Sequence, residues 1–166
     1  MAAGKSRWKP NRERGAVIME LAVAIPLLLL MVAGVIDLGF LFWEREVLTN
    51  ATREGARAGA QAVVDGKAAL RVSEVKTLVQ TYLQNYKIKN GSGGNITLGS
   101  GNFSYTWNTS TNPALLTVRL FNIPVKMMLL PNIKNFFPGE PMDSTIYLNA
   151  ETTMAAEWVN TSTPSP

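Results

Sequence analysis

The hydrophobic pattern begins with one long apolar run. Residues 16 to 43 read AVIMELAVAIPLLLLMVAGVIDLGFLFW, and only Glu20 and Asp37 interrupt this run with charge. A helix needs roughly 20 apolar residues to cross the hydrocarbon core of a bilayer. The run therefore predicts one membrane-spanning helix. Pro26 lies within it, and we interpret this proline as a local kink that membrane helices tolerate, with a flex point used during assembly as the alternative.

The apolar run is longer than one crossing needs, so two placements of the bilayer remain. If the bilayer covers residues 16 to 36, Asp37 lies at its outer surface. If it covers residues 21 to 43, Glu20 lies at its inner surface and an outer aromatic belt forms from Phe40, Phe42 and Trp43. The pattern alone does not decide between them.

The helical pattern continues beyond the apolar run. Residues 44 to 63 contain no proline and are rich in alanine, glutamate and arginine, which favour helix. A continuous helix over residues 16 to 63 would be about 70 Å long, so its second half would stand outside the membrane. Small residues recur every four positions at Ala51, Gly55 and Gly59, and such a stripe allows close helix packing. The charged residues around this stripe are Arg53, Glu54 and Arg57.

The rest of the chain predicts a small α+β domain. Asp65-Gly66 breaks the long helix, and a second, amphipathic helix is expected over residues 68 to 86. Its apolar face would comprise Val72, Val75, Val79, Tyr82 and Tyr86. After a flexible loop over residues 90 to 102, alternation typical of a short antiparallel sheet appears in three segments. These contain Phe103, Tyr105 and Trp107, then Leu116, Val118 and Leu120, then residues 145 to 157. Residues 131 to 141 are expected to form an irregular loop around Phe136-Phe137, and the tail from residue 160 to be disordered.

Charge and composition narrow the function. The net charge is +4, and all of this excess comes from the first fifteen residues, so the folded body is formally neutral. We therefore expect no nucleic-acid binding, which needs a basic face on the domain itself. The chain has no cysteine and no histidine, which excludes disulfides, Cys/His zinc sites, cysteine nucleophiles and histidine bases. No cofactor and no metal site are predicted.

The junction before the apolar run has the pattern of a processing site. A basic leader with Lys5, Arg7, Lys9, Arg12 and Arg14 ends at Gly15, and Glu20 follows five residues later. In a secretory signal peptide the apolar region is removed with the leader, whereas a cut between Gly15 and Ala16 would leave the apolar helix as the new N-terminus. Glu20 lies one helical turn after Ala16, so its carboxylate can reach the new α-amine or that of a neighbour. The alternative is that Glu20 only extends to the interface.

Three features together resemble the TadE-like family, pseudopilins of the tight-adherence (Flp-type) pilus. They are Gly15 with Glu20, the apolar run with Pro26, and the motif NATREGARAGA at residues 50 to 60. The resemblance implies a member of the type IV pilin superfamily that a prepilin peptidase cleaves at Gly15–Ala16. It also implies a minor pilin, or an initiator of filament assembly. Leu21 follows Glu20 where major Flp pilins have tyrosine, and this chain is longer than theirs, so the accessory role is favoured.

The prediction is therefore a structural, non-enzymatic protein with four segments. Residues 1–15 form the cytoplasmic leader, 16–63 the transmembrane and assembly helix, 64–159 the outer domain and 160–166 the tail. The leader directs the N-terminus to the cytoplasm of a bacterial inner membrane, with the body outside. Expected partners are membrane lipid, other pilin or pseudopilin helices, the prepilin peptidase and the inner-membrane assembly platform. The alternatives are a repeating major filament subunit and a permanently anchored extracytoplasmic binding protein.

Overall fold

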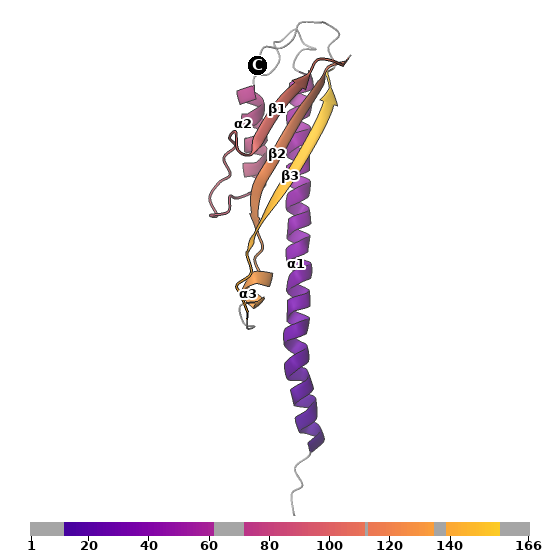
Figure 1. The fold of residues 1–166 in the computed structure, drawn as a ribbon, viewed down its shortest axis with the longest axis vertical. Coiled ribbons are helices and arrows are strands. Elements are labelled where there is room, and N and C mark those ends of the chain that lie inside the picture. Colours follow the sequence, from indigo (N-terminus) through magenta and orange to yellow (C-terminus); the bar gives the residue numbers. More distant parts are fainter. Residues whose placement is uncertain (1–11, 62–71, 112, 135–138, 157–166) are drawn as a thin grey trace, which may run out of the picture.

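A computed structural model describes residues 12–61, 72–111, 113–134 and 139–156. One long helix, α1 (Arg12–Gln61), carries a small domain against its C-terminal part (Figure 1). The domain consists of α2 (Val72–Asn85), β1 (Phe103–Asn108), β2 (Leu115–Lys126), α3 (Leu130–Lys134) and β3 (Thr145–Ala155). The predicted α+β class is confirmed, with the long apolar helix first and an antiparallel sheet after it.

Helix α1 is continuous over 50 residues, which corresponds to a length of about 75 Å. Pro26 lies inside it without ending it. A proline removes one backbone hydrogen bond and crowds the preceding turn, but helix formers such as Leu27, Leu28 and Leu29 follow at once and keep the neighbouring turns helical. The helix therefore continues from the apolar run into the domain, as the pattern predicted.

The sheet has the strand order β1-β2-β3, and both strand pairs are antiparallel. The central strand β2 continues past Leu120 to Lys126, further than the alternating pattern indicated. Its register with β3 shifts between Leu120 and Ile123, where Asn122 adopts a φ of 52°. The backbone N–H of Asn122 donates to the side-chain oxygen of Asn149 at 2.9 Å, so this irregularity leaves no unpaired donor there. After the shift Ile123 and Val125 are buried, so the second half of β2 also contributes to the core.

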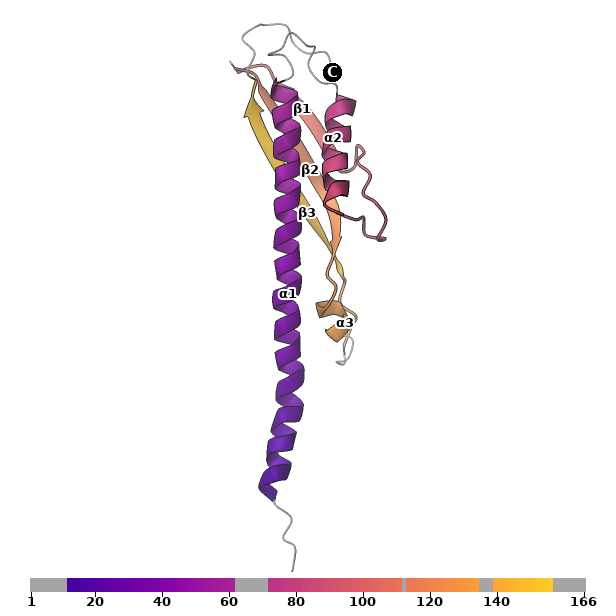
Figure 2. The ribbon, with the colours of Figure 1, turned by 180° about the vertical axis from the view of Figure 1, so that it is seen from behind.

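Helices α1 and α2 lie on the same side of the sheet, as the view from behind shows (Figure 2). The core fills the space between the upper part of α1, α2 and this face of the sheet. Its side chains are apolar and almost completely buried: Val47, Leu48, Ala51, Ala56, Val75, Val79, Leu83, Ile88, Ile96, Leu98, Phe103, Leu116, Val118, Leu120, Ile123 and Ala150. The small domain therefore uses the long helix as one wall of its own core.

The buried face of α2 differs in part from the predicted stripe. Val75 and Val79 are buried as expected, but the next core position is Leu83, one turn further on. Tyr86 lies beyond the end of the helix and is exposed, and its ring stacks on Tyr82 with 4.9 Å between centroids. Tyrosines suit this rim position because the phenol oxygen stays in water while the ring packs.

The segment predicted as a flexible loop takes part in the core. Ile96 and Leu98 are buried, and two glutamines of α2 bond to the backbone beside them. Gln84 donates to the carbonyl of Ile96 at 3.2 Å, and Gln80 accepts from the N–H of Leu98 at 3.0 Å. Isolated apolar residues between glycines and asparagines have no periodicity, so the pattern could not reveal their burial.

The prediction of an irregular loop over residues 131 to 141 is wrong at its start, where the short helix α3 forms. Pro131 occupies its first turn, where the missing N–H costs nothing because first-turn donors have no partner inside the helix. Other predicted features lie outside the described residues: the leader up to residue 11, the break at Asp65-Gly66, the start of the second helix, Phe136-Phe137, and the chain from residue 157 onward. The division into four segments remains a prediction.

Candidate functional site along the long helix

The N-terminal half of α1 does not pack against the small domain. Residues 15 to 32 include no buried residue. Large apolar side chains are exposed all around the helix; for example Val23 is 72% and Leu28 is 62% exposed. This part of α1 is long and apolar enough to cross a membrane. Water would disfavour such a surface, so the segment requires lipid or other apolar helices around it.

The predicted processing residues lie within this bare segment. Gly15 is helical, and an added Cβ would meet no atom within 4 Å. Ala16 and Glu20 are both exposed, and their four-residue spacing places them on one face of α1. Pro26 is half-buried. The chain's own packing therefore gives no reason for a glycine at position 15, although glycine costs about 1 kcal/mol relative to alanine inside a helix.

The stripe of small residues has a packing role inside the chain. Ala51, Gly55 and Gly59 are all buried against the domain. A Cβ at Gly55 would lie 2.5 Å from Cγ2 of Val79 on α2, and one at Gly59 would lie 2.5 Å from Cδ2 of Leu116 on β2. The stripe thus permits the close approach of α2 and the sheet to α1. Contacts of this stripe with other subunits remain a prediction.

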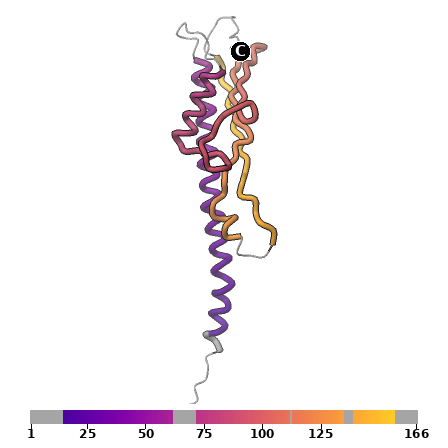
Figure 3. Tube along the Cα trace, turned by 90° about the vertical axis from the view of Figure 1, so that its left-hand side faces the viewer, coloured from indigo at the N-terminus to yellow at the C-terminus, as the bar shows by residue number. Residues whose placement is uncertain are grey.

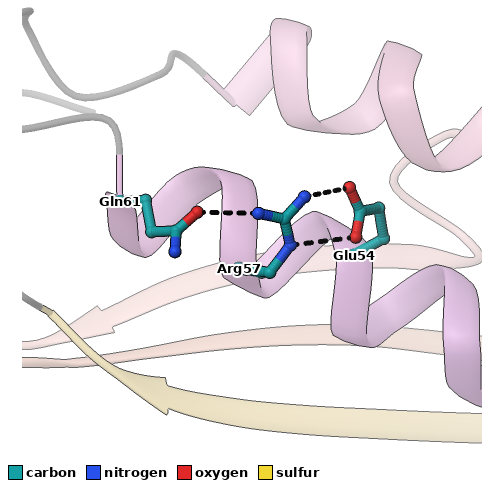
Figure 4. Close-up of polar contacts among 3 residues, drawn as sticks. All are labelled: Glu54, Arg57 and Gln61. Carbon is teal, nitrogen blue, oxygen red and sulfur yellow. Dashed lines mark hydrogen bonds and ion pairs between the residues drawn. The ribbon is translucent and has the colours of Figure 1, made fainter.

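The charged residues of the same segment point away from the core. Arg57 donates to both carboxylate oxygens of Glu54, at 2.6 and 3.1 Å, and to Gln61 at 2.8 Å (Figure 4). The hydrogen bond from Arg57 lowers the pKa of Glu54 below its ordinary value. Arg53 is exposed one turn before Arg57. The motif around Gly55 therefore has one buried face of small residues and one face on which Glu54 and Arg57 are held by hydrogen bonds.

Asp37 has a role that the sequence pattern did not reveal. Its side chain is only 3% exposed, although it lies within the apolar run. One carboxylate oxygen accepts from the N–H groups of Met128 and Leu129, both at 3.1 Å. The other accepts from Leu129 at 3.0 Å and Leu130 at 2.6 Å. Asp37 therefore caps the N-terminus of α3 from another element, where a negative charge is favoured by the free donors and the helix dipole.

Two clues for this contact exist in the sequence, but neither identifies the partner. A lone carboxylate in an apolar run needs a polar partner, and three consecutive backbone donors precede Pro131. They are separated from Asp37 by more than 90 residues, so only the tertiary fold brings them together.

A second buried polar residue, Thr52, also ties α1 to the sheet. Its hydroxyl lies 2.8 Å from the hydroxyl of Thr152 on β3 and donates to the carbonyl of Thr49 at 2.8 Å. Among the described residues no group of three or more His, Cys, Asp or Glu side chains could hold a metal ion. The candidate functional features of the described residues are therefore the exposed apolar surface of α1 and the contacts of α1 with α3 and the sheet.

This architecture, with one N-terminal apolar helix and a small domain packed on its far half, fits a single-pass membrane protein. The model of a family described as TadE-like protein matches residues 15–57, so the resemblance seen in the sequence is confirmed over this segment. That family comprises structural proteins of the Tad pilus system, and the match lies entirely within α1. No curated protein and no solved structure matches the chain.

Proposed function

We propose that this chain is a pilin-like structural subunit, a minor pilin or pseudopilin, whose N-terminal helix packs into or primes a Tad-type pilus. The observation that carries this proposal is the bare apolar half of α1, which has no buried residue from Gly15 to Val32. Such a helix can exchange lipid for the helices of other subunits without changing the packing of its own domain. The proposed partners are pilin or pseudopilin helices, membrane lipid and the inner-membrane assembly platform.

Processing by a prepilin peptidase at Gly15–Ala16 is part of this proposal. The family match starts at Gly15 and excludes the basic leader. Gly15 has open space around its Cα, so the fold itself would accept a larger residue there. A requirement for glycine would then come from an enzyme that must bind the backbone closely. The basic leader supports a cytoplasmic N-terminus, because basic flanks of membrane helices favour that side.

Glu20 is the proposed assembly carboxylate. Cleavage would place a free α-amine on Ala16, one turn away. An unpaired carboxylate at the bilayer centre costs about 2.5 to 3.5 kcal/mol, and less toward the edge. Pairing with its own amine or that of a neighbouring subunit would offset this cost and set the axial position of the subunit in the filament.

The processing step is tested by intact-mass analysis of the protein purified from its native membrane. We expect Ala16 as the first residue of wild type and retention of the leader in Gly15→Leu. Gly39→Leu is the matched control, since Gly39 also has open space and lies in the same helix, and it should be cleaved normally. Wild type that keeps Met1, or a cut after the apolar run, would contradict the proposal.

The assembly step is tested in sheared surface filaments. Glu20→Gln should insert into the membrane at wild-type levels and yet be depleted from filaments, whereas the exposed Glu46→Gln should be incorporated normally. Quantitative proteomics gives the copy number per filament. A few copies support an accessory subunit, and stoichiometric abundance would identify a repeating major subunit. Absence from filaments with the leader retained would indicate a permanently anchored binding protein.

A further inference from the structure

The connection between β2 and β3 reaches beyond the sheet toward the membrane half of α1. Helix α3 lies beside α1 well below the strands, and the side view shows the same arrangement (Figures 1 and 3). Gly34 and Asp37 of α1 contact it, and the neighbouring Ala33 is buried; all three belong to the apolar run. This connection is therefore the part of the described domain nearest to the proposed bilayer.

This position is held by specific contacts. Asp37 accepts four hydrogen bonds from the backbone of Met128, Leu129 and Leu130. Leu130 lies close to Gly34, because a Cβ added at Gly34 would lie 3.2 Å from Cδ1 of Leu130. Pro131 is also buried. The backbone donors and the carboxylate satisfy each other, so α3 is fixed against α1 at one level.

At this level the outer surface of the connection is apolar. Met128 is 65% and Leu129 is 38% exposed. At the same level of α1, Val35 is 71% exposed and Ile36 is exposed as well. Exposed apolar side chains therefore occur both on α1 and on the connection at this level, and gathered exposed apolar side chains mark membrane or protein contacts.

The length of α1 between Ala16 and Asp37 indicates where α3 lies relative to the bilayer. Asp37 lies 21 residues after Ala16, which corresponds to about 32 Å along a helix. The hydrocarbon core is about 30 Å thick. A bilayer that begins at Ala16 therefore ends at the level where α3 contacts α1. Placement over residues 21 to 43 would instead put α3, with the charged Lys134 in its last turn, inside the hydrocarbon, where a charged side chain is costly.

We propose that α3 rests on the outer boundary of the bilayer, with Met128 and Leu129 in contact with phospholipid at the junction of acyl chains and headgroups. This inference depends on the single membrane crossing, not on assembly into a pilus. Lys126, Glu140 and Asp143 are exposed near this tip and remain in the hydrated headgroup layer. The hydrogen bonds of Asp37 to the start of α3 then fix the distance between the domain and the membrane surface.

The test uses the absence of cysteine in the chain. Single cysteines at Leu28, Met128 and Thr106 carry a nitroxide label in full-length protein reconstituted into phosphatidylcholine–phosphatidylglycerol vesicles. Power-saturation spectroscopy compares the accessibility of each label to oxygen, which concentrates in lipid, and to a water-soluble nickel chelate. All three positions are exposed, so labelling leaves the core unchanged.

We expect the oxygen-to-nickel ratio at Met128→Cys to be several-fold higher than at Thr106→Cys and lower than at Leu28→Cys. A ratio at Met128→Cys equal to that at Thr106→Cys would overturn the proposal. Low accessibility to both reagents at Met128→Cys would overturn it too, because it would indicate a protein partner on the tip. A water-like ratio at Leu28→Cys would refute the membrane crossing itself, whereas a filament defect alone would not affect the result.

Discussion

The two halves of α1 follow opposite rules of packing within one continuous helix. From Gly15 to Val32 no residue is buried, and large apolar side chains surround the axis. From Val47 to Ala60 a stripe of mostly small residues is buried, while Arg53 and Arg57 face water on the other side. A helix that is apolar all around fits a membrane, and one with a single apolar stripe fits a domain surface.

This difference in burial shows which contacts stabilise each half of α1. The N-terminal half depends on what surrounds it, and its backbone hydrogen bonds are all internal. The C-terminal half depends on contacts with α2 and the sheet, and glycine is used where those contacts are closest. Asp37 lies between the halves and connects them to the domain through α3. The following predictions test this division, beginning with the largest expected effect.

Matched leucines give the largest contrast. Leu48 is fully buried, whereas Leu28 is 62% exposed. Leu48→Ala should lower the free energy of unfolding of the domain by about 2–5 kcal/mol, because it leaves a cavity. Leu28→Ala should leave it unchanged within about 0.5 kcal/mol. Denaturant unfolding in detergent micelles, followed by tryptophan fluorescence, measures both. Equal effects would show that the halves do not differ as described.

The second-largest effect is expected from removal of the Asp37 carboxylate, which lies between the two halves of α1. Asp37→Ala leaves three backbone donors of α3 without an acceptor, and hydrogen bonds to charged groups contribute about 1.5–3 kcal/mol each at most. We expect local release of α3, seen as much faster amide hydrogen exchange at Leu129 and Leu130. Exchange at Val118 in the central strand should change little. Asp143→Asn, at an exposed turn, is the control and should leave α3 protected.

Glycine substitutions test the close contact in the domain half. Gly55→Ala places a Cβ 2.5 Å from Val79, and overpacking costs about 1–3 kcal/mol, partly offset by the gain of about 1 kcal/mol in helix propensity. Gly39→Ala meets no atom within 4 Å and should keep only the gain. Thermal unfolding should therefore shift in opposite directions for the two variants. A stabilised Gly55→Ala would show that α2 is not held close to α1.

The charged face should have the smallest effect on stability. Arg57 lowers the pKa of Glu54, so the pair stabilises the folded state at pH above the ordinary glutamate value, and this contribution disappears as pH falls through the folded pKa. An exposed helical pair contributes about 0.3–0.5 kcal/mol. The stability difference between wild type and Glu54→Gln should therefore be small at neutral pH and vanish in acid. If Arg53→Ala or Arg57→Ala reduces filament incorporation without loss of stability, the charged face is an assembly surface.

The sequence was sufficient wherever a feature depends on local periodicity. The apolar run, the helical continuation and the alternating strands were predicted because spacing along the chain reports which faces become buried. Leu83 was missed because Tyr82 and Tyr86 continued the spacing of the valines equally well, although Tyr86 lies beyond the end of α2. Ile96 and Leu98 were missed because residues buried singly in a loop leave no periodic signal.

The sequence by itself determined the long apolar helix and the α+β class, since composition and period within a short window are enough for these. Processing at Gly15–Ala16 remains a prediction from the sequence. Only the tertiary structure decided that the small stripe packs on its own domain, and that Asp37 caps α3. The physical reason is distance along the chain: Gly59 meets Leu116, and Asp37 meets Leu130. Such pairs depend on how whole elements pack against each other, which no local pattern specifies.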